Sequence, residues 1–405
     1  MPAGVLDGLR VIEGSAFVAA PLGGMTLAQN GADVIRFDQI GGGPDFNRWP
    51  LAADGQSLFW AGLNKGKRSI AVDLRSDAGR ELALALITAT GLFLTNFPMR
   101  GWLEFETLRR RREDVIVVAL TGDPDGTSEL DYTVNPATGF PWITGPREHA
   151  DPVNHVLPAW DIALGTLAAF GILAAERHRS ITGAGQIVRV ALSDVAFWMV
   201  GNLGRVAQAR LETEAQVKDG NHLYGAFGHD FQTRDGRRVM VAALTRRQWL
   251  ALRDVTGLAT GCEEIERSTG HDLGTQTGRF MARDAIAALL RPWFAAREFA
   301  EVRERFDGAG VSWGPYQTFT QLVEEDPRCS PANPLFEELE HPGVGSYPMP
   351  GSPLWFDAVT RGPVRRAPAL GEHTDEILAG LLGLTDAEIG RLHGSGTVAG
   401  PQAPP

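Results

Sequence analysis

Residues 9–38, "LRVIEGSAFVAAPLGGMTLAQNGADVIRFD", decide the fold of this chain. Short apolar runs at 9–14 and 32–38 are typical of buried strands, and residues 20–31 between them have the apolar spacing of a helix. Gly31 stands where such a helix would stop. A strand, a helix and a second strand in this order predict a parallel sheet with covering helices.

The same alternation continues through the first two hundred residues. Residues 77–90 have helical spacing and end at Gly91, and four more apolar runs follow the first two: "RSIAVDL" (68–74), "LFLTNF" (92–97), "VIVVAL" (115–120) and "QIVRVAL" (186–192). Strands that alternate with helices predict one α/β domain, which we assign to residues 1–210.

A different pattern begins after about Gly220. Two strand-like runs within "HDFQTRDGRRVMVAAL" (229–244) are joined through Asp235-Gly236, and amphipathic helical segments follow them. A hairpin followed by helices predicts a small α+β domain at 221–316.

The last segment, 317–405, begins with Pro- and Gly-rich sequence. The stretch "NPLFEELEHPGVGSYPMPGSP" (333–353) is interpreted as loops, because Pro and Gly interrupt regular structure. Two helical segments follow, at 374–383 and 385–393.

Length and charge exclude several classes of protein. The chain has 405 residues, more than one hydrophobic core usually fills, so two domains are expected. Its net charge of −11 disfavours nucleic acid or an anionic membrane as the main partner. Cys262 and Cys329 are far apart and indicate reduced thiols in a cytoplasm, and no metal-ligating cluster is present.

Two common nucleotide-binding motifs are missing. The segment "EGSAFVAAPLGG" (13–24) follows the first strand without the Gly-x-Gly-x-x-Gly turn of a dinucleotide site, so a nicotinamide or flavin enzyme is disfavoured. The glycine-rich "GGGPDFNRW" (41–49) lacks the Gly-Lys-Ser/Thr ending of a Walker A loop, and a mobile loop is its ordinary interpretation.

Polar residues cluster beside two of the predicted strands. Lys65, Lys67 and Arg68 would suit the phosphates of a nucleotide-like ligand, and a solvated basic turn is an equally good interpretation. Asn96 ends another strand and Arg100 lies just beyond it. Because ligands of open α/β sheets bind at the carboxyl ends of strands, the two clusters favour a shared crevice.

Asp161 introduces fourteen uncharged residues in "NHVLPAWDIALGTLAAFGILAAERH" (154–178). The run is shorter than the roughly 20 residues of a membrane span, and its Gly and Ala content indicates a close-packed buried helix. The carboxylate is therefore a helix cap, a partner of a cation, or a reactive group. From the residues alone a cap is the commonest of these, since Pro158 suits a chain that enters a helix. The nearby histidines are interpreted as structural, because none has the spacing of a catalytic triad: His149, His155 and His178.

Several motifs occur together in one order: "LDGLRVIEGSAF" (6–17), "NKGKRSIAVDL" (64–74), "TNFPMRG" (95–101), "LPAWDIALGTLAAFGILAAERHRSITGAGQIVRVAL" (157–192) and "GEHTDEIL" (371–378). In this combination the chain resembles the class III CoA-transferase (CaiB/BaiF) family over essentially its full length. Its segments "GSAFVAAPLGGMTLAQ" (14–29) and "NHLYGAFGHDF" (221–231) are most similar to members that move CoA between the two carboxyl groups of one branched, unsaturated C5 dicarboxylic acid.

The resemblance implies a fold and partners. A Rossmann-like large domain would be built from both ends of the chain, with 317–405 as its return segment and the small domain between, in an interlocked homodimer. The implied substrate is the CoA thioester of the C5 dicarboxylic acid. No metal, no cofactor beyond that CoA moiety, no nucleic acid and no membrane are implied, and the implied compartment is the cytoplasm.

The resemblance also implies site residues. Asp161 falls on the family's nucleophilic aspartate. The positions that would bind CoA are Phe17, Val18, Gln39, Val72, Asp73, Leu74, Arg75, Asn96, Phe97 and Arg100. Residues 222–228 lie where relatives have a glycine-rich loop over the acyl group, and its candidate residues are Tyr224, Gly225 and Gly228. This segment has fewer glycines than the family's loop.

The expected activity is that of an isomerase that transfers CoA within one molecule through a covalent aspartyl-CoA intermediate. A cation should hold the idle carboxylate, and Arg48 and Arg147 are candidates by charge and position. An intermolecular CoA transferase between a dicarboxylate and an acyl-CoA shares every catalytic residue and is the nearest alternative. An α-methylacyl-CoA racemase is disfavoured, because Leu130 stands where those enzymes carry a catalytic histidine. A non-catalytic CoA-binding protein is disfavoured by the intact Asp161 motif.

Overall fold

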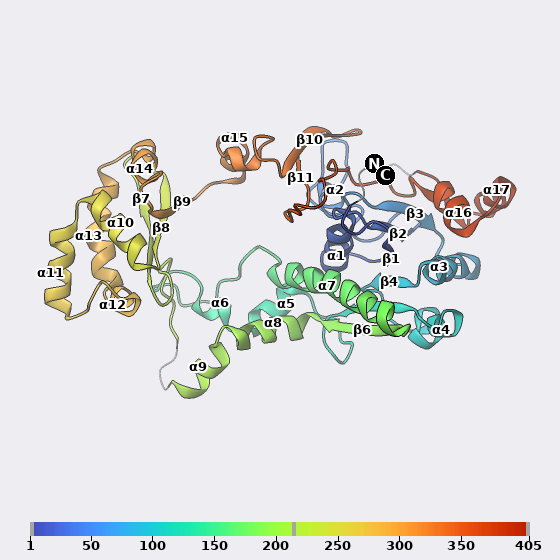
Figure 1. The fold of residues 1–405 in the computed structure, drawn as a ribbon, viewed down its shortest axis with the longest axis horizontal. Helices are drawn as coiled ribbons and strands as arrows, with labels where there is room; N and C mark the ends of the chain where they lie inside the picture. Colours follow the sequence, from blue (N-terminus) through green and yellow to red (C-terminus); the bar gives the residue numbers. More distant parts are fainter. Residues whose placement is uncertain (1–3, 213–215, 402–405) are drawn as a thin grey trace. The chain divides into compact units, whose positions relative to one another are not determined.

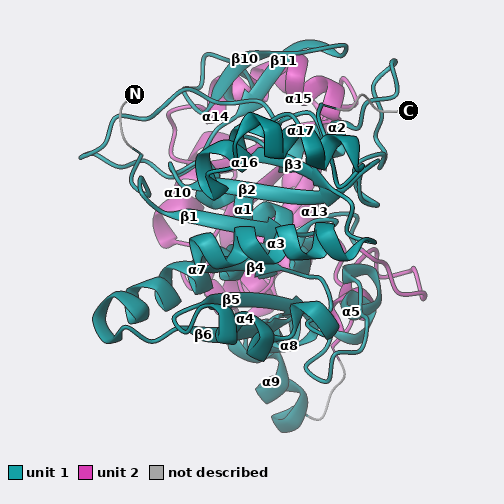
Figure 2. Cartoon of the chain, turned by 90° about the vertical axis from the view of Figure 1, so that its right-hand side faces the viewer, with its two compact units in different colours: residues 1–138, 155–213, 327–405 teal, residues 139–154, 214–326 magenta. Residues whose placement is uncertain are grey.

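The computed structural model describes residues 4–212 and 216–401. The chain divides into two compact units (Figure 2): unit 1 is Met1–Thr138, His155–Thr213 and Pro327–Pro405, and unit 2 is Gly139–Asn154 and Glu214–Asp326. This division differs from the expected domain boundaries in two places. Residues 139–154 and 317–326, which the sequence assigned to the large domain, both belong to unit 2.

Unit 1 is built on a seven-stranded sheet whose strand order is β12-β3-β2-β1-β4-β5-β6. Its strands are β1 (Arg10–Gly14), β2 (Asp33–Gln39), β3 (Arg68–Val72), β4 (Leu92–Thr95), β5 (Ile116–Thr121), β6 (Gln186–Ala191) and β12 (Val398–Ala399). All neighbours pair in parallel except β12, which is antiparallel to β3. The predicted parallel sheet is confirmed, and its first six strands lie on the six apolar runs.

Helices cover both faces of this sheet. One face is covered by α3 (Asp77–Thr90), α4 (Phe105–Arg111), α16 (Thr374–Leu382) and α17 (Asp386–Gly394), which lie toward the viewer in Figure 2. They enclose a core that includes Phe37, Phe93, Leu86 and Ile377, none of which has exposed surface. The other face carries α1 (Ala19–Ala28), α7 (Ala159–Thr182) and α8 (Leu192–Asn202), with α7 against β5 and β6. Strands buried on both faces need continuous apolar runs, which explains why the sequence marked them clearly.

Two glycines let α1 and α7 approach each other closely. A Cβ atom on Gly165 of α7 would lie 2.5 Å from the backbone oxygen of Ala19, and one on Gly23 of α1 would lie 3.0 Å from the backbone oxygen of Gly165. The contact fixes the first turns of α7 beside the loop that joins β1 to α1.

A buried cluster of charges ties the loop after β2 to the sheet. The Arg36 guanidinium donates to Asp38 at 2.9 Å and to Asp45 at 3.0 Å, and the Lys67 ammonium donates to Glu13 at 2.8 Å. All five side chains have almost no exposed surface. Buried charges are tolerated when they are paired in this way, so the position of residues 41–50 is strongly specified.

Lys67, in the basic cluster of the sequence, therefore has a different role from either interpretation. Lys67 is neither solvated nor free for a phosphate, and burial lowers the pKa of its ammonium to about 8. Arg68 pairs with Asp33 at 2.6 Å. Lys65 is also buried, and this burial lowers its pKa to about 8.

Unit 2 contains a three-stranded antiparallel sheet of β7 (Phe227–Gln232), β8 (Arg238–Ala243) and β9 (Ser312–Pro315) (Figure 1). The hairpin turns at Gly236 as the sequence predicts, whereas β9 was not predicted. Helices pack on this sheet around Phe231 and Phe294, whose rings stack at 4.4 Å: α10 (Arg246–Thr256), α11 (Ala259–Thr269), α12 (Gln276–Met281), α13 (Arg283–Ala295) and α14 (Phe299–Phe306).

The loop prediction for 333–353 is wrong. The segment forms an antiparallel hairpin of β10 (Phe336–His341) and β11 (Gly345–Pro350). Gly343 and Gly345 have positive φ and make the turn, and a two-stranded ribbon tolerates proline because outward N–H groups are not needed. The remaining short elements are α2 (Leu58–Leu63), α5 (Asp131–Ala137), α6 (Phe140–Ile143), α9 (Arg205–Leu211), α15 (Phe319–Glu325), η1 (Gly101–Leu103) and η2 (Pro327–Cys329).

The glycine contact between α1 and α7 can be tested with two substitutions in one helix. Gly165→Ala should lower the free energy of unfolding by about 1–3 kcal/mol, because its Cβ meets backbone that has no room to move. Gly171→Ala is the matched control, since its Cβ has its nearest neighbour at 3.7 Å. It should stabilise the protein by up to about 1 kcal/mol through helix propensity. Denaturant titration measures both, and equal stabilisation by the two variants would contradict the close contact.

Candidate active site

The site lies at the carboxyl ends of the parallel strands. The chain leaves β1 for β2 and β3 on one side and later returns to place β4 on the other side of β1. At such a reversal of strand order, adjacent connections diverge and leave a crevice where ligands bind in open α/β sheets. The crevice between β1 and β4 is therefore the expected place for a ligand.

The loop after β1 is held in an unusual conformation. Phe17 has a φ of 66°, and it is the one residue other than glycine with positive φ in the described part of the chain. Asn96, which follows β4, accepts from the backbone N–H of Ala16 at 2.9 Å and donates to its oxygen at 2.8 Å. A bulky side chain in this conformation is strained, and such strain is concentrated at functional sites. Phe17 and Asn96, both predicted to bind CoA, thus lie together.

A second group of predicted residues forms a turn after β3. Gln39, the last residue of β2, accepts from the backbone N–H of Leu74 at 3.0 Å and donates to the Asp73 carboxylate at 3.2 Å. The hydrogen bond from Gln39 lowers the pKa of Asp73. Arg75 is exposed at the edge of this turn, whereas the Val72 side chain is fully buried. Any ligand contact at Val72 must therefore involve its backbone.

The other predicted CoA residues lie at the ends of neighbouring elements. Val18 precedes the first residue of α1, and Arg100 precedes η1 with an exposed side chain. Phe97 is half-buried, and its ring packs edge-on against Phe37 in the core.

Asp161 lies in the first turn of α7, but it does not cap the helix. The N-cap residue is Pro158, and its side chain makes no capping hydrogen bond. The Asp131 carboxylate, from the start of α5, instead accepts from the backbone N–H groups of Trp160 at 2.7 Å and Asp161 at 3.1 Å. The cap interpretation of Asp161 is wrong, because another carboxylate already serves the helix N-terminus.

The Asp161 carboxylate itself has no partner. It is half-buried and makes no hydrogen bond or ion pair with any residue in 4–212 or 216–401. Burial and the nearby negative charge of Asp131 raise its pKa to about 6, and the charge of Arg48 opposes this rise. At neutral pH the carboxylate is mostly ionised but poorly solvated, which suits a nucleophile.

Sequence reasoning missed the role of Asp131. Its contacts with α7 join residues about thirty positions apart, and the local sequence "ELDYTVN" contains no signal for them. Asn135, one turn later in α5, accepts from the Trp160 indole N–H at 3.1 Å. An Asp and an Asn four residues apart on one helix face are the only hint that a second helix N-terminus packs there.

The two candidate cations differ in their partners. Arg147, in unit 2, pairs with Asp219 and with Asp284. The Arg48 guanidinium forms no ion pair or hydrogen bond with any residue of the described ranges, and it lies over the rings of Phe17 at 5.5 Å and Phe59 at 5.2 Å. Arg48 is therefore the candidate with a charge still to be neutralised.

The predicted loop over the acyl group belongs to unit 2. Tyr224 is 62 % exposed and touches Phe280 edge-on, and Gly225 has a φ of 75°. Gly228 is the second residue of β7, and its backbone oxygen accepts from the N–H of Leu223. Next to the loop, the half-buried His222 stacks on His229 at 4.2 Å, and burial lowers the pKa of both imidazoles. The exposed Tyr224 is therefore flanked by residues that are held by stacking and hydrogen bonds.

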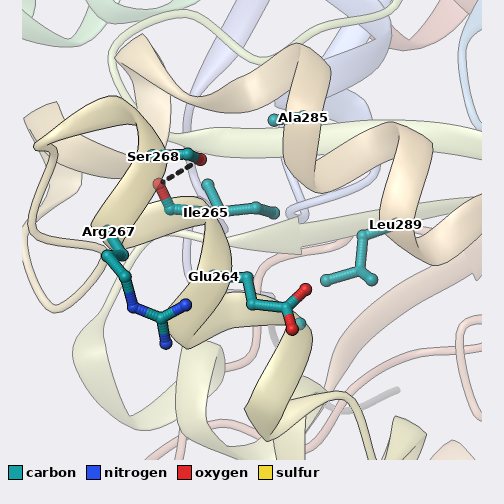
Figure 3. A pocket seen from close by; sticks show the side chains of 7 residues that line it. Glu264, Ile265, Arg267, Ser268, Ala285 and Leu289 are labelled. Atoms are coloured by element: carbon teal, nitrogen blue, oxygen red, sulfur yellow. Dashed lines mark hydrogen bonds between the residues drawn. The ribbon is translucent and has the colours of Figure 1, made fainter.

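Two hollows lined by described residues, one in each unit, contain none of the predicted site residues. One, of about 610 Å³, lies between α11 and α13 of unit 2 (Figure 3), where the Ser268 hydroxyl is already bonded to the Ile265 oxygen. The other, of about 340 Å³, lies in unit 1 between Leu58 and the β10–β11 hairpin. No group of three potential metal-ligating side chains occurs within 4–212 and 216–401.

α7 is longer than the fourteen uncharged residues suggested. It has 24 residues, and it is the one described helix whose length and composition would allow it to cross a membrane. Its Leu164, Ala168 and Ile172 are buried against the rest of unit 1. A buried core helix meets the same criteria, so this is weak evidence for a membrane.

Comparisons with known proteins agree on one family. The family described as CoA-transferase family III matches residues 6–374. The chain is 58 % identical to the 2-methylfumaryl-CoA isomerase of Chloroflexus aurantiacus over 98 % of each chain, and 31 % identical to the succinyl-CoA:mesaconate CoA-transferase of Haloarcula marismortui over 93 % of this chain and 96 % of that one.

A solved structure supports the fold. A CAIB/BAIF family protein from Brucella suis superposes with a TM-score of 0.77 at 24 % identity, covering 94 % of this chain and all of that one. With the match of the family over residues 6–374 and the identity to its isomerase member, this chain belongs to CoA-transferase family III.

Proposed function

We propose that this enzyme interconverts 2-methylfumaryl-CoA and 3-methylfumaryl-CoA, the C1 and C4 thioesters of mesaconate. It is an isomerase that moves CoA between the two carboxyl groups of one molecule. The observation that carries this proposal is the 58 % identity to the 2-methylfumaryl-CoA isomerase over nearly the whole chain. The unpartnered Asp161 at the start of α7 supplies the chemistry.

The first half of the reaction transfers CoA to the enzyme. The Asp161 carboxylate attacks the thioester carbon; a C–O bond forms, the C–S bond breaks, and CoA leaves as a thiolate, giving a mixed anhydride. The thiolate then attacks the aspartyl carbonyl of the anhydride. The products are an aspartyl-CoA thioester and the free dicarboxylate, and no net proton transfer is needed.

The second half reverses these steps at the other carboxyl group. The acid turns in the site, its second carboxylate attacks the aspartyl thioester, and CoA thiolate leaves again. The thiolate attacks the new acyl carbonyl, which forms the isomeric thioester and returns Asp161 as a carboxylate. Each step uses a group that the enzyme or the substrate already holds, so we expect no cofactor beyond the CoA of the substrate.

The CoA moiety is proposed to lie across the strand ends of a Rossmann-like domain. The strand order β3-β2-β1-β4-β5-β6 and the reversal at β1 support this assignment. The exposed Arg75 at the turn after β3 can serve a phosphate, and the loop of Ala16 and Phe17 borders the crevice beside Asn96. Both free cysteines, Cys262 and Cys329, support a reducing cytoplasm as the compartment.

Two alternatives have less support. The intermolecular transferase has relatives at lower identity, such as the 31 % identical enzyme of Haloarcula marismortui. The racemase needs a second base, and Leu130, which occupies the position of its histidine, is an exposed apolar residue.

We also propose a homodimer with interlocked chains. Its support is an apolar surface on α7, α8 and α9, whose exposed large side chains are Phe170, Phe197, Trp198, Val206 and Leu211. Monomeric soluble proteins rarely expose so many neighbouring large apolar side chains, and such surfaces mark interfaces.

Isomerisation should need no added acid. Purified enzyme given 2-methylfumaryl-CoA alone should form 3-methylfumaryl-CoA, and ¹³C-labelled free mesaconate added to the reaction should stay out of both thioesters. Chromatography of the isomers with mass spectrometry measures both quantities. Label that enters the product as fast as isomerisation proceeds would establish the intermolecular transferase instead.

Asp161→Asn should abolish turnover and yet stabilise the protein. An amide cannot form the anhydride, so isomerisation should fall by roughly three orders of magnitude or more. Asp161 keeps its proton up to about pH 6 in the folded state, whereas an aspartate in the unfolded chain has a pKa of 3.8, so stability falls as pH rises between these two values. At pH 7 this costs up to about 3 kcal/mol, which the neutral variant avoids, and the difference should vanish below pH 4. Near-normal turnover by the variant would exclude the covalent mechanism.

The dimer should resist dilution, because interlocked chains cannot separate without unfolding. Sedimentation velocity from micromolar to nanomolar protein should give one species with the mass of two chains. Trp198→Asp places a charge on the proposed apolar interface and should lower the yield of dimer formed on refolding. A wild-type monomer that grows with dilution would exclude the interlocked arrangement.

A further inference from the structure

The proposed reaction has a requirement that Asp161 does not meet. After CoA moves to Asp161, the dicarboxylate is bonded to nothing and carries two negative charges beside a half-buried site. It must stay long enough to turn and react again, or the enzyme becomes an intermolecular transferase. A cation in the site is the direct way to retain it. The inference below rests on the proposed function and assigns this cation.

Three cations near the crevice are already neutralised. Arg36 is paired with Asp38 and Asp45, Lys67 with Glu13, and Arg68 with Asp33. Arg48 differs from them, because its guanidinium has no counter-ion and no hydrogen-bond acceptor among residues 4–212 and 216–401, although its side chain is only partly exposed. Such a group keeps its full capacity to bind an anion.

Aromatic rings and backbone contacts fix where Arg48 lies. Its guanidinium is over the Phe17 ring at 5.5 Å and the Phe59 ring at 5.2 Å, and these ring contacts use none of its N–H groups, which are left for a ligand. The Arg48 oxygen accepts from the Ser57 hydroxyl at 2.5 Å, and its N–H donates to the Asp45 oxygen at 3.3 Å. Asp45 is itself held by the buried Arg36. The cation is therefore pre-organised before any ligand arrives.

Arg48 also lies within electrostatic reach of the nucleophile. Its charge acts on the Asp161 carboxylate and opposes the rise in its pKa. Phe17, which packs on Arg48, belongs to the loop that the contact between Gly165 and Ala19 holds beside α7. Asp161 precedes Gly165 by one helical turn, so both residues face that loop.

We propose that Arg48 binds the carboxylate that is not bonded to CoA, and that this contact keeps the acid in the site between the two transfers. A guanidinium edge can donate two parallel hydrogen bonds to a carboxylate, which also orients the acid. When the acid turns, its two carboxylates exchange places, and Arg48 then holds the one that has just been released. Arg48 thereby determines that the reaction is intramolecular and that the substrate is a diacid.

The test compares Arg48→Gln and Arg48→Lys with the wild-type enzyme. Arg303→Gln is a matched control, because Arg303 also lies over an aromatic ring, Phe299, at 4.8 Å and is exposed in α14 of unit 2. Each protein is given 2-methylfumaryl-CoA together with ¹³C-labelled mesaconate, and isomer formation, labelled thioester and released free acid are measured. The wild-type enzyme must isomerise in this assay, and its failure to do so would reject the proposed function and not the role of Arg48.

Arg48→Gln should lower isomerisation roughly tenfold or more, release free mesaconate, and incorporate label into both thioesters. Arg48→Lys should leak less, since it keeps a charge but loses the two-pronged contact. A second measurement is inhibition by 2-methylcrotonyl-CoA, in which a methyl group replaces the idle carboxyl group. The inhibition constants should distinguish Arg48→Gln from the wild-type enzyme and from Arg303→Gln. Wild type and Arg303→Gln should bind 2-methylcrotonyl-CoA much more weakly than substrate, and Arg48→Gln should lose most of this preference.

Two results would overturn the proposal. One is an Arg48→Gln enzyme that is slower but neither releases acid nor incorporates label, and that regains its rate at higher pH, because Arg48 would then only tune Asp161. The other is an equal loss of affinity for the diacid thioester and for 2-methylcrotonyl-CoA, which would place Arg48 on the CoA moiety.

Discussion

The carboxylate of Asp131 holds the start of α7, and the active-site geometry of unit 1 depends on this contact. It accepts hydrogen bonds from the N–H groups of Trp160 and Asp161, so one carboxylate fixes both the helix end and the proposed nucleophile. The same negative charge raises the pKa of Asp161. If α7 began elsewhere, Gly165 would no longer meet Ala19, and the strained loop at Phe17 would lose its support. A single buried acceptor thus links the reactivity of the site to its shape.

The cost of this arrangement falls on stability. If Asp161 capped α7, its carboxylate would stabilise the helix in the usual way. It lies instead beside the carboxylate of Asp131, and the repulsion between the two negative charges is destabilising. The enzyme keeps an ionisable group where its charged form is poorly solvated, and the rest of unit 1 must offset that cost. Local destabilisation of this kind is common where a group must react.

The sequence predicted the sheet well, for a physical reason. Strands such as β4 and β5 are buried on both faces, so nearly every residue in them is apolar, and the helices between the strands carry clear stops such as Gly91. The β10–β11 hairpin was not predicted, because prolines usually indicate a loop. In this hairpin the prolines lie at ladder positions where no N–H group is needed.

The site was predictable only in part. The residues alone left Asp161 between a cap and a nucleophile, and the family resemblance identified it as the reactive group. Neither the residues alone nor the resemblance predicted the contacts around Asp161. Asp131 contacts α7 from about thirty residues away in the sequence, and Lys67 contacts Glu13 from more than fifty residues away. Contacts of this length leave no local pattern, so Lys67 looked like a surface charge. The sequence could not choose between Arg48 and Arg147 as the cation for the idle carboxylate. The structure favours Arg48, because Arg147 is paired with two aspartates.

The buried cluster of Glu13, Arg36, Asp38, Asp45 and Lys67 has a consequence for how such enzymes diverge. Two cations and three anions from two strands, a loop and the entry to β3 pair with one another in the interior, with a formal net charge of −1. Removal of either cation would leave further uncompensated negative charge in the interior, so Arg36 and Lys67 can change only together with their partners. The loop that carries Arg48 is attached to this cluster through Asp45. A new substrate preference is therefore more accessible by exchange of single residues on the loop than by grafting a relative's loop, which would bring its own charges into a cluster whose members are already paired.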